Sequence, residues 1–297
     1  MALLEVSNLG IAFGGLQAVA QLDLSIEKGH LYGLIGPNGA GKTTVFNMLT
    51  GVYKPTEGNI ILDGKDITGQ NPELISKSGI ARTFQNIRLF NDMTVLDNVK
   101  VGLHNQIRYN MWTGILRLPA YKEKEHEMNR EAMKLLKIFD LDKEADYKAS
   151  QLPYGKQRKL EIARALATNP KLLLLDEPFA AIDAKVRQEL RSWLKEMISK
   201  LGVTSIFVTH DQDEAIEVAD EIIITNRGHI EQMGTPIEIY RHPQTAFTAS
   251  FFGQTSVLAD YQKYHTFQRM DGVEKAIVRP EFLKITRKNE VQKYGSS

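Results

Sequence analysis

The residues best suited to chemistry begin with a glycine-rich segment near the N-terminus. Residues 36–43 read Gly-Pro-Asn-Gly-Ala-Gly-Lys-Thr, which matches the phosphate-binding pattern G-x-x-x-x-G-K-S/T. Glycines let such a loop curl so that several backbone N–H groups face one point, and a following helix adds the positive end of its dipole. We expect the Lys42 ammonium to reach the outer phosphates of a nucleotide and the Thr43 hydroxyl to bind magnesium. The alternative is a glycine-rich turn without a ligand, and the flanking strand and helix patterns disfavour it.

Two acidic residues follow a short apolar segment in the second half of the chain. Residues 172–175 are four leucines, and Asp176 and Glu177 come directly after them. Side chains at the carboxyl end of a buried parallel strand point into the crevice where ligands bind. We therefore expect Asp176 to hold magnesium through water and Glu177 to deprotonate an attacking water. The alternative is a favourable charge effect at a helix N-terminus.

A histidine and a glutamine could complete this site. His210 ends residues 204–210, which have a strand pattern, so we expect its ring at the same sheet edge and in contact with phosphate or water. The other histidines are expected to be structural. Gln85 lies where the strand patterns give way to helical ones, and its amide could touch magnesium or the attacking water.

A second anion-binding arrangement lies far along the chain. Residues 152–157 read Leu-Pro-Tyr-Gly-Lys-Gln and lead into an amphipathic helix pattern with Leu160, Ala163 and Ala167 on its packing face. A helix N-terminus beside a glycine suits an anion. One nucleotide need not touch both arrangements within the same subunit.

Composition excludes several classes of function. Among 297 residues, Lys and Arg total 37 and Asp and Glu total 36, a net charge of +1, which provides no global field for nucleic acid, so none is expected as a partner. The absence of Cys excludes disulfides and thiolate chemistry. The N-terminus has no signal-peptide pattern, and no apolar run reaches the length of a membrane span. At a membrane, the chain would have to dock onto a partner that spans it.

The order of the predicted elements indicates the fold class. Apolar strand patterns alternate with helix patterns, which predicts an α/β fold with a largely parallel sheet covered on both faces. We expect strands at residues 31–35, 172–175, 204–208, 221–225 and 276–286, and helices at 43–49, 186–201 and 214–219. Helical spacing of Leu, Met, Lys and Glu predicts a helical insert at about residues 88–165. We expect one domain over residues 1–243 and a short extension, partly strand, over residues 244–297.

Taken in order, these features resemble the nucleotide-binding subunit of ATP-binding cassette transporters, over about residues 3–240. The resemblance implies a phosphate-loop NTPase fold with an antiparallel N-terminal β subdomain and an inserted helical subdomain. It implies that Glu177, His210 and Gln85 are catalytic and that Thr43, Gln85 and Asp176 bind Mg²⁺. Phe13 matches the aromatic residue that stacks on adenine. The implied ATP contacts are Phe13, Val19, Gly36, Pro37, Asn38, Gly39, Ala40, Gly41, Lys42, Thr43, Thr44, Leu152, Pro153, Tyr154, Gly155, Lys156, Gln157 and Asp183.

The resemblance also implies partners. Two subunits of this family hold two ATP molecules head to tail, each between the phosphate loop of one subunit and the signature turn, residues 152–157, of the other. The resemblance further implies that the chain binds integral membrane permease subunits at the cytoplasmic face of the membrane. The permease is expected to occupy a groove of this chain near residues 85–118. The candidate lining residues are Ile87, Leu89, Phe90, Met111 and Trp112, for which internal helix packing is the alternative.

The likeness divides near residue 178. Up to that point the chain resembles branched-chain amino-acid importer subunits, in residues 13–19, 81–88 and 152–158. After it the chain resembles sulfate-type importer subunits, in residues 179–187, 208–215, 234–240 and 278–281. A natural or engineered hybrid would show this pattern.

The chain also departs from the family pattern. Pro153, Tyr154 and Lys156 replace the usual Ser, Gly and Gln of the signature turn, and the tail after Pro243 is too short for a full regulatory barrel. The favoured function is the ATPase of a branched-chain amino-acid importer. The alternatives are a sulfate-type importer ATPase, a soluble cassette ATPase, a hybrid without a transporter, or a phosphate-loop kinase.

Overall fold

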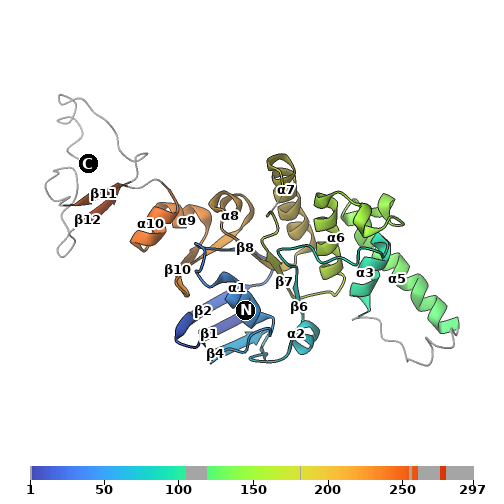
Figure 1. Ribbon diagram of the computed structural model, residues 1–297, viewed down its shortest axis with the longest axis horizontal. Coiled ribbons are helices and arrows are strands. Elements are labelled where there is room, and N and C mark those ends of the chain that lie inside the picture. Colours follow the sequence, from blue (N-terminus) through green and yellow to red (C-terminus); the bar gives the residue numbers. More distant parts are fainter. Residues whose placement is uncertain (1, 105–118, 181, 254–255, 260–274, 279–297) are drawn as a thin grey trace. The chain divides into compact units, whose positions relative to one another are not determined.

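The chain forms two compact units in the computed structural model, Met1–Pro236 and Ile237–Ser297 (Figure 1). The structure describes residues 2–104, 119–180, 182–253, 256–259 and 275–278. Every described residue of the predicted site belongs to the first unit. The sequence places the boundary between its two parts slightly later, after residue 243.

A six-stranded sheet forms the centre of the first unit, in the order β10-β9-β3-β8-β7-β6. Its strands are β3 (Leu31–Ile35), β6 (Ile80–Arg82), β7 (Leu172–Asp176), β8 (Thr204–Thr209), β9 (Glu221–Asn226) and β10 (His229–Gly234). All neighbours are parallel except β10, which runs antiparallel to β9 and has no counterpart among the predicted strands. Every residue of β3, β7 and β8 is buried, as continuous apolar segments require when helices cover both faces.

The register of the central strands determines where the site forms. Ile35 pairs with Thr209, and Asp176 pairs with Val208. The carboxyl ends of β3, β8 and β7 therefore meet at one edge of the sheet, which confirms the predicted parallel arrangement.

A second, antiparallel sheet is built from the N-terminal strands, in the order β2-β1-β4-β5. Its strands are β1 (Ala2–Phe13), β2 (Leu16–Glu27), β4 (Glu57–Leu62) and β5 (Lys65–Asp66). Alternating apolar residues of this sheet share one core cluster with helix α1 (Lys42–Leu49) and with β3, β7 and β8. The antiparallel subdomain that the resemblance implies is thus confirmed.

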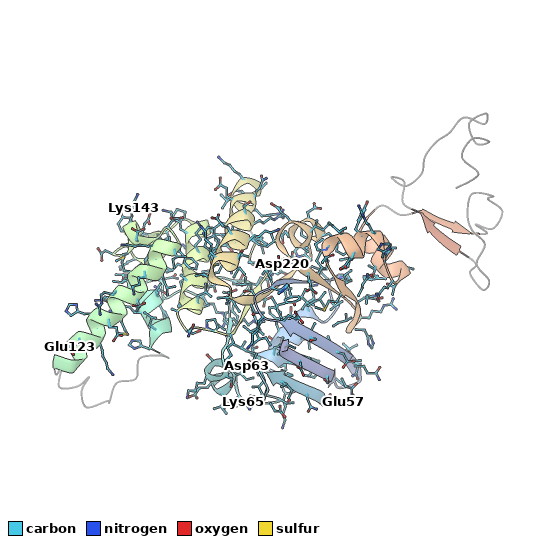
Figure 2. The ribbon with its side chains drawn as sticks, turned by 180° about the vertical axis from the view of Figure 1, so that it is seen from behind. Glu57, Asp63, Lys65, Glu123, Lys143 and Asp220 are labelled. Atoms are coloured by element: carbon cyan, nitrogen blue, oxygen red, sulfur yellow. The ribbon has the colours of Figure 1, made fainter. Side chains whose placement is uncertain are left out.

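An aspartate in the turn after β4 joins this sheet to the central one. Asp63, labelled in Figure 2, lies 2.7 Å from Lys28 Nζ and 2.6 Å from Lys171 Nζ, the latter immediately before β7. Hydrogen bonds from Lys171 and Lys28 lower the pKa of the Asp63 carboxyl to about 2. The side chains of Lys28, Lys171 and Asp63 are 59%, 49% and 33% exposed. These two ion pairs therefore contribute little to the free energy of unfolding and act mainly by orienting the two sheets.

The remaining helices of the first unit fall into two groups. In the predicted helical insert, the described elements are α3 (Val95–Leu103), α5 (Pro119–Ile138), the 3₁₀ turns Asp142–Glu144 and Ala149–Gln151, and α6 (Tyr154–Leu166). Elsewhere lie α2 (Pro72–Ser78), which the sequence patterns did not predict, α7 (Ala184–Leu201) and α8 (Gln212–Val218). Asp183 and Gly202 begin and end α7 as an N-cap and a left-handed C-cap.

The second unit holds α10 (Ala246–Phe251) and an antiparallel pair of strands, β11 (Ser256–Ala259) and β12 (Lys275–Val278). Helix α9 (Pro236–Arg241) begins at the last residue of the first unit. Of the strand predicted at residues 276–286, the first residues belong to β12, and residues 279–286 lie outside the described chain.

The contact between α3 and α6 requires a glycine. A Cβ at Gly102 would lie 2.4 Å from the Arg164 carbonyl oxygen and 2.7 Å from the Ala167 Cβ. Helix propensity alone would make Gly102→Ala stabilising by about 1 kcal/mol. Because backbone atoms must move apart, we expect a net loss of about 1–3 kcal/mol of unfolding free energy, measured by urea denaturation.

Gly15→Ala is the control for this prediction. Within the described chain, no heavy atom lies within 4 Å of the Cβ position at Gly15. Its unfolding free energy should match that of the parent. A Gly102→Ala protein as stable as the parent would show that α3 and α6 do not pack this closely.

Candidate nucleotide site

The glycine-rich loop connects β3 to α1 and has the backbone geometry of a phosphate cradle. Gly41, at the N-cap of α1, has φ 95°, a left-handed conformation that disfavours other residues. A Cβ at Gly36 would lie 2.1 Å from the Thr225 carbonyl oxygen on the neighbouring strand β9. The loop thus packs against the edge of the sheet, and the N-terminus of α1 faces the concave side of the loop. The sequence predicts this arrangement for anion binding.

Lys42 folds back over this loop. Its Nζ donates hydrogen bonds to the Gly36 carbonyl oxygen at 2.7 Å and to the Pro37 carbonyl oxygen at 3.0 Å, and the residue is 7% exposed. Burial lowers the pKa of the Lys42 ammonium, while the nearby Glu177 carboxylate opposes that shift. A buried cation held mainly by carbonyl oxygens is stabilised further by a phosphate anion, so the predicted role of Lys42 suits its surroundings.

A cavity of about 410 Å³ opens in front of the loop. It is lined by Leu16, Gln17, Ala18, Asn38, Gly39, Ala40, Gly41, Lys42, Thr43, Thr44, Glu177 and Arg227. Seven of these were predicted as nucleotide contacts from the loop pattern, and Glu177 was predicted as the base. Leu16, Gln17, Ala18 and Arg227 were not predicted, because nothing in their local sequence marks a ligand contact.

Four of the contacts predicted near the phosphate loop lie outside this lining: Gly36 and Pro37, whose carbonyl oxygens accept from Lys42, and Val19 and Phe13. Val19 is fully buried, and its side chain lies beneath Gly41, so the neighbouring Ala18 reaches the cavity in its place. Phe13 is 45% exposed and packs edge-on against Tyr53, with ring centroids 5.2 Å apart. An exposed aromatic face remains compatible with stacking on a base.

Gln85, Glu177 and His210 meet beside the cavity. Gln85 Nε2 donates a hydrogen bond of 2.8 Å to Glu177 Oε2, and His210 Nδ1 lies 3.7 Å from Glu177 Oε1. Glu177 has φ 42°, and its N–H donates to the Val208 carbonyl oxygen at 3.1 Å, which anchors this unusual backbone to β8. The three residues predicted as catalytic therefore form one cluster around a single carboxylate.

Asp176 lies at the end of β7 but is engaged by an arginine. Arg82 Nη2 donates to Asp176 Oδ2 at 2.6 Å, and both side chains are 9% exposed. Thr43 is exposed in the first turn of α1 and lines the cavity. A hydroxyl and a carboxylate are oxygen ligands that suit Mg²⁺. The described residues hold no cluster of three or more His, Cys, Asp or Glu, so a magnesium ion here would also need phosphate oxygens and water.

The predicted signature turn lies apart from this cavity. Pro153, Tyr154, Gly155, Lys156 and Asp183 line a separate cavity of about 440 Å³ at the start of α6. Gln157 Nε2 donates to the Leu152 carbonyl oxygen at 2.8 Å, so these two residues close the turn rather than face the cavity. Lys156 forms an ion pair with Glu144, and Asp183 accepts a hydrogen bond from the Val186 N–H at the start of α7.

Sequence reasoning missed a buried ion pair that supports the cluster. Arg158 is fully buried and donates hydrogen bonds of 2.7 Å to the Phe84 and Gln85 carbonyl oxygens and to Glu161. Glu161 in turn accepts from the Arg88 N–H at 3.1 Å. Spacing puts Arg158 and Glu161 on one face of α6, opposite Leu160 and Ala163, so the apolar pattern gave no signal that this charged face is buried as well.

This fold and its phosphate loop define the class of phosphate-loop ATPases. The chain belongs to the ABC transporter family, because that family's profile, described as "ABC transporter", matches residues 19–180. The structure places the three residues predicted as catalytic, Glu177, Gln85 and His210, together at the carboxyl edge of the sheet. A kinase that transfers phosphate to a second substrate is not supported.

Relatives with two different cargoes resemble this chain equally well. The sulfate/thiosulfate import ATP-binding protein CysA of Thermosynechococcus vestitus is 42% identical over 269 residues, covering 91% of this chain and 74% of that protein. The high-affinity branched-chain amino acid transport ATP-binding protein BraF of Pseudomonas aeruginosa is 41% identical over 241 residues, covering 81% of this chain and 94% of that protein. The two alignments cover 91% and 81% of this chain, so each extends past residue 178. They therefore do not locate a boundary between two parental sequences at that position.

Solved structures agree with the family. The ADP conformation of an ATP-binding cassette of an ABC transporter has a TM-score of 0.71 and 30% identity, and it covers 84% of this chain and 98% of that chain. A nucleotide-free ATP-binding cassette from an ABC transporter has a TM-score of 0.71 over 86% of this chain. Among the described residues, no helix is both long and apolar enough to span a bilayer.

The clustered carboxylate generates a prediction about rate. Glu177→Gln keeps the size of the side chain and its contact with Gln85 but removes the proton acceptor. We expect ATP hydrolysis to fall by roughly 10²–10⁴-fold while fluorescent-ATP binding persists, as measured by phosphate release and by titration.

Glu196→Gln is the matched control, because Glu196 is an exposed glutamate on α7 that pairs with Lys200, away from the lining of the phosphate-loop cavity. Its hydrolysis rate should equal that of the parent. Hydrolysis by Glu177→Gln within threefold of the parent would assign the base to another group.

The buried Arg158–Glu161 pair generates a prediction about stability. Arg158→Leu leaves the Glu161 carboxylate buried without its guanidinium. We expect a loss of about 3–5 kcal/mol of unfolding free energy, and the double variant Arg158→Leu/Glu161→Leu should recover part of it, because no uncompensated charge remains. Urea denaturation of the three proteins measures this, and a double variant less stable than Arg158→Leu would contradict the reasoning.

Proposed function

We propose that the chain is the ATP-hydrolysing subunit of an importer and works with Mg²⁺ and ATP. The observation that carries this proposal is the Glu177 carboxylate, which lines the phosphate-loop cavity and is held by Gln85 beside His210. An ordered carboxylate there can accept the proton of an attacking water, while the Gln85 amide and the His210 ring orient the water and the outer phosphate. Bound magnesium would neutralise phosphate charge, with Thr43 and Asp176 as its ligands from the chain.

The separation of the two cavities supports a head-to-tail dimer. The phosphate loop and the signature turn line different cavities of one chain, so each chain offers half of each site. A second copy, or a related nucleotide-binding subunit, would bring its signature turn over the phosphates. Pro153 supplies neither a hydroxyl nor an N–H there, and Lys156 is already paired with Glu144, so the N–H groups at the start of α6 are the donors this turn offers.

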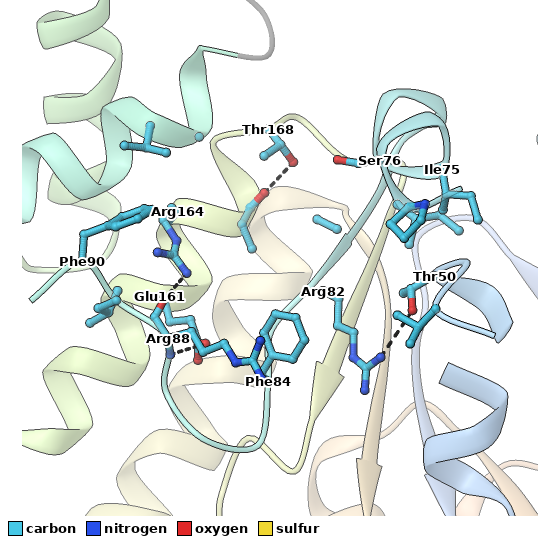
Figure 3. A pocket seen from close by; sticks show the side chains of 18 residues that line it. Thr50, Ile75, Ser76, Arg82, Phe84, Arg88, Phe90, Glu161, Arg164 and Thr168 are labelled. Atoms are coloured by element: carbon cyan, nitrogen blue, oxygen red, sulfur yellow. Dashed lines mark hydrogen bonds between the residues drawn. The ribbon is translucent and has the colours of Figure 1, made fainter. Parts of the chain in front are cut away.

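A groove beside the segment between β6 and α3, residues 83–94, supports a membrane partner; we refer to this segment as the Gln85 loop. The groove has a volume of about 670 Å³ and lies between α2, β6, α3 and α6, with Phe84, Arg88, Leu89, Phe90 and Arg164 among its lining (Figure 3). We refer to it as the Phe84 groove. Arg88 stacks on Phe84 at 4.2 Å and Arg164 on Phe90 at 5.3 Å, so its surface combines apolar rings with positive charge.

The predicted lining of this groove is found in part. Leu89 and Phe90 line it, whereas Ile87 does not, and Met111 and Trp112 lie outside the described residues. A permease segment that docks here would place this chain at the cytoplasmic face of the membrane as a peripheral subunit.

The cargo we propose is branched-chain amino acids. Every residue lining the Phe84 groove precedes residue 178, in the part that resembles branched-chain amino-acid importer subunits, and partner choice should follow the docking surface. Sulfate is the second candidate, favoured by the 42% identity with a sulfate/thiosulfate import protein.

Coexpression distinguishes these cargoes. We expect this chain to copurify with a branched-chain amino-acid permease pair and not with a sulfate permease pair. Phe90→Asp should weaken recovery at least tenfold, because a charge replaces an exposed ring in the groove, whereas Ile138→Asp, at an exposed position on α5 outside it, should not. Recovery with the sulfate pair alone would overturn the proposed cargo.

A further inference from the structure

Arg82, the last residue of β6, joins three elements around the predicted metal site. Its Nη2 donates to Asp176 Oδ2 at 2.6 Å, at the end of β7. Its Nη1 donates to Asn47 Oδ1 at 2.7 Å and to Thr50 Oγ1 at 3.3 Å, on the last turn and C-cap of α1. Figure 3 shows Arg82 beside Phe84, with its bond to Thr50 drawn.

Aromatic rings and burial hold the Arg82 guanidinium in one place. It lies 5.6 Å from the centroid of the Phe46 ring and 5.3 Å from that of Phe84. The Arg82 side chain is only 9% exposed. A planar fork between two rings, with partners on both of its terminal nitrogens, loses little conformational freedom when it binds a carboxylate.

Arg82 contacts the two elements that carry two of the three expected metal ligands, β7 and α1. Asp176 is one of these ligands, and Thr43, on the first turn of α1, is another; the third, Gln85, donates its amide hydrogen to Glu177. Thr43 and Asn47 are four residues apart on α1, so they lie on the same face of that helix. Through Asn47 and Asp176, Arg82 therefore ties the helix that carries the hydroxyl to the strand that carries the carboxylate.

We propose that Arg82 is a positioning residue for the metal that accompanies ATP: it holds the Asp176 carboxylate at a set distance from the Thr43 end of α1. This inference rests on the proposed function, since the metal is the one expected with ATP. Partners that orient metal ligands from outside the coordination shell typically contribute 10–100-fold to metal affinity.

Charge alone predicts the opposite effect. A guanidinium beside a cation site repels the cation, so its removal by itself would tighten metal binding. Positioning and repulsion thus change the metal affinity in opposite directions. The Arg82→Lys variant adds a second distinction, because it keeps the charge but cannot donate to Asn47 and Asp176 at once in fork geometry.

The test measures binding rather than hydrolysis. Mn²⁺ serves as the probe, with its affinity for the protein–ATP complex measured by electron paramagnetic resonance, and ATP affinity without metal is measured with a fluorescent analogue in EDTA. We expect Arg82→Met and Arg82→Lys to weaken Mn²⁺ binding by about 10-fold or more and to leave metal-free ATP affinity unchanged. Unchanged or tighter Mn²⁺ binding in Arg82→Met would overturn the inference.

Two further variants separate positioning from general damage. Lys171→Met removes a cation paired with Asp63 at the opposite end of β7 and should leave Mn²⁺ affinity unchanged. In an Asp176→Asn background, Arg82→Met should cause no further loss if Arg82 acts through that carboxylate. A further loss of tenfold in that background would overturn the inference.

Failure of the inference and failure of the proposed function give different results. A parent chain that binds neither ATP nor Mn²⁺ with ATP would contradict the proposed function, whereas a normal parent with an unaffected Arg82→Met variant would contradict only the role of Arg82. If Arg82→Met does not fold, Asn47→Ala tests the same connection, since it removes the shorter of the two hydrogen bonds from Arg82 to the end of α1 and leaves the bond to Thr50 and the pair with Asp176. Asn47→Ala should weaken Mn²⁺ binding in the same direction but less, and no change would overturn the inference.

Discussion

The parallel alignment of β3, β8 and β7 is the constraint on which the rest of this structure depends. Ile35 and Asp176 pair with adjacent residues of β8, so the segments that follow these strands leave the sheet at the same level. The phosphate loop, the acidic pair and His210 are those segments. A one-residue shift of β7 against β8 would move Glu177 from the cavity, and the buried strand opposes that shift because a charged end residue, Lys171 or Asp176, would take a position now held by leucine.

The Gln85 loop depends on this edge in a different way. It is held by side chains from α6, since Arg158 binds the carbonyl oxygens of Phe84 and Gln85 and Glu161 binds the Arg88 N–H. The same loop provides Gln85, which donates to the Glu177 carboxylate, and Phe84, which lines the groove. Movement of α6 would therefore reach both the cavity and the groove through the buried hydrogen bonds of Arg158 and Glu161, which is a physical basis for coupling between them.

The sequence predicted those features that residues close together in the chain determine. The phosphate loop, the buried strands and the helix at residues 186–201 are each specified within a few residues, and the structure confirms them, with α7 beginning two residues earlier, at Ala184, after its N-cap Asp183. The pairs around the site are different. Gln85 and Glu177 are 92 residues apart, and Arg82 and Asp176 are 94 apart, so neither contact follows from spacing or periodicity. Val19 was assigned to the nucleotide by resemblance, yet its apolar side chain is better satisfied beneath Gly41, which only the packed structure reveals.

The left-handed backbone at Glu177 has a consequence for the amino-acid substitutions that this position favours. A residue other than glycine in this conformation costs about 1–2 kcal/mol, and glycine or asparagine would relieve much of that strain. A screen for stability alone would therefore favour replacing Glu177. Because we propose Glu177 as the base, we expect this position to set thermostability against turnover, and a stabilising substitution there to give an ATPase that folds well but does not hydrolyse ATP.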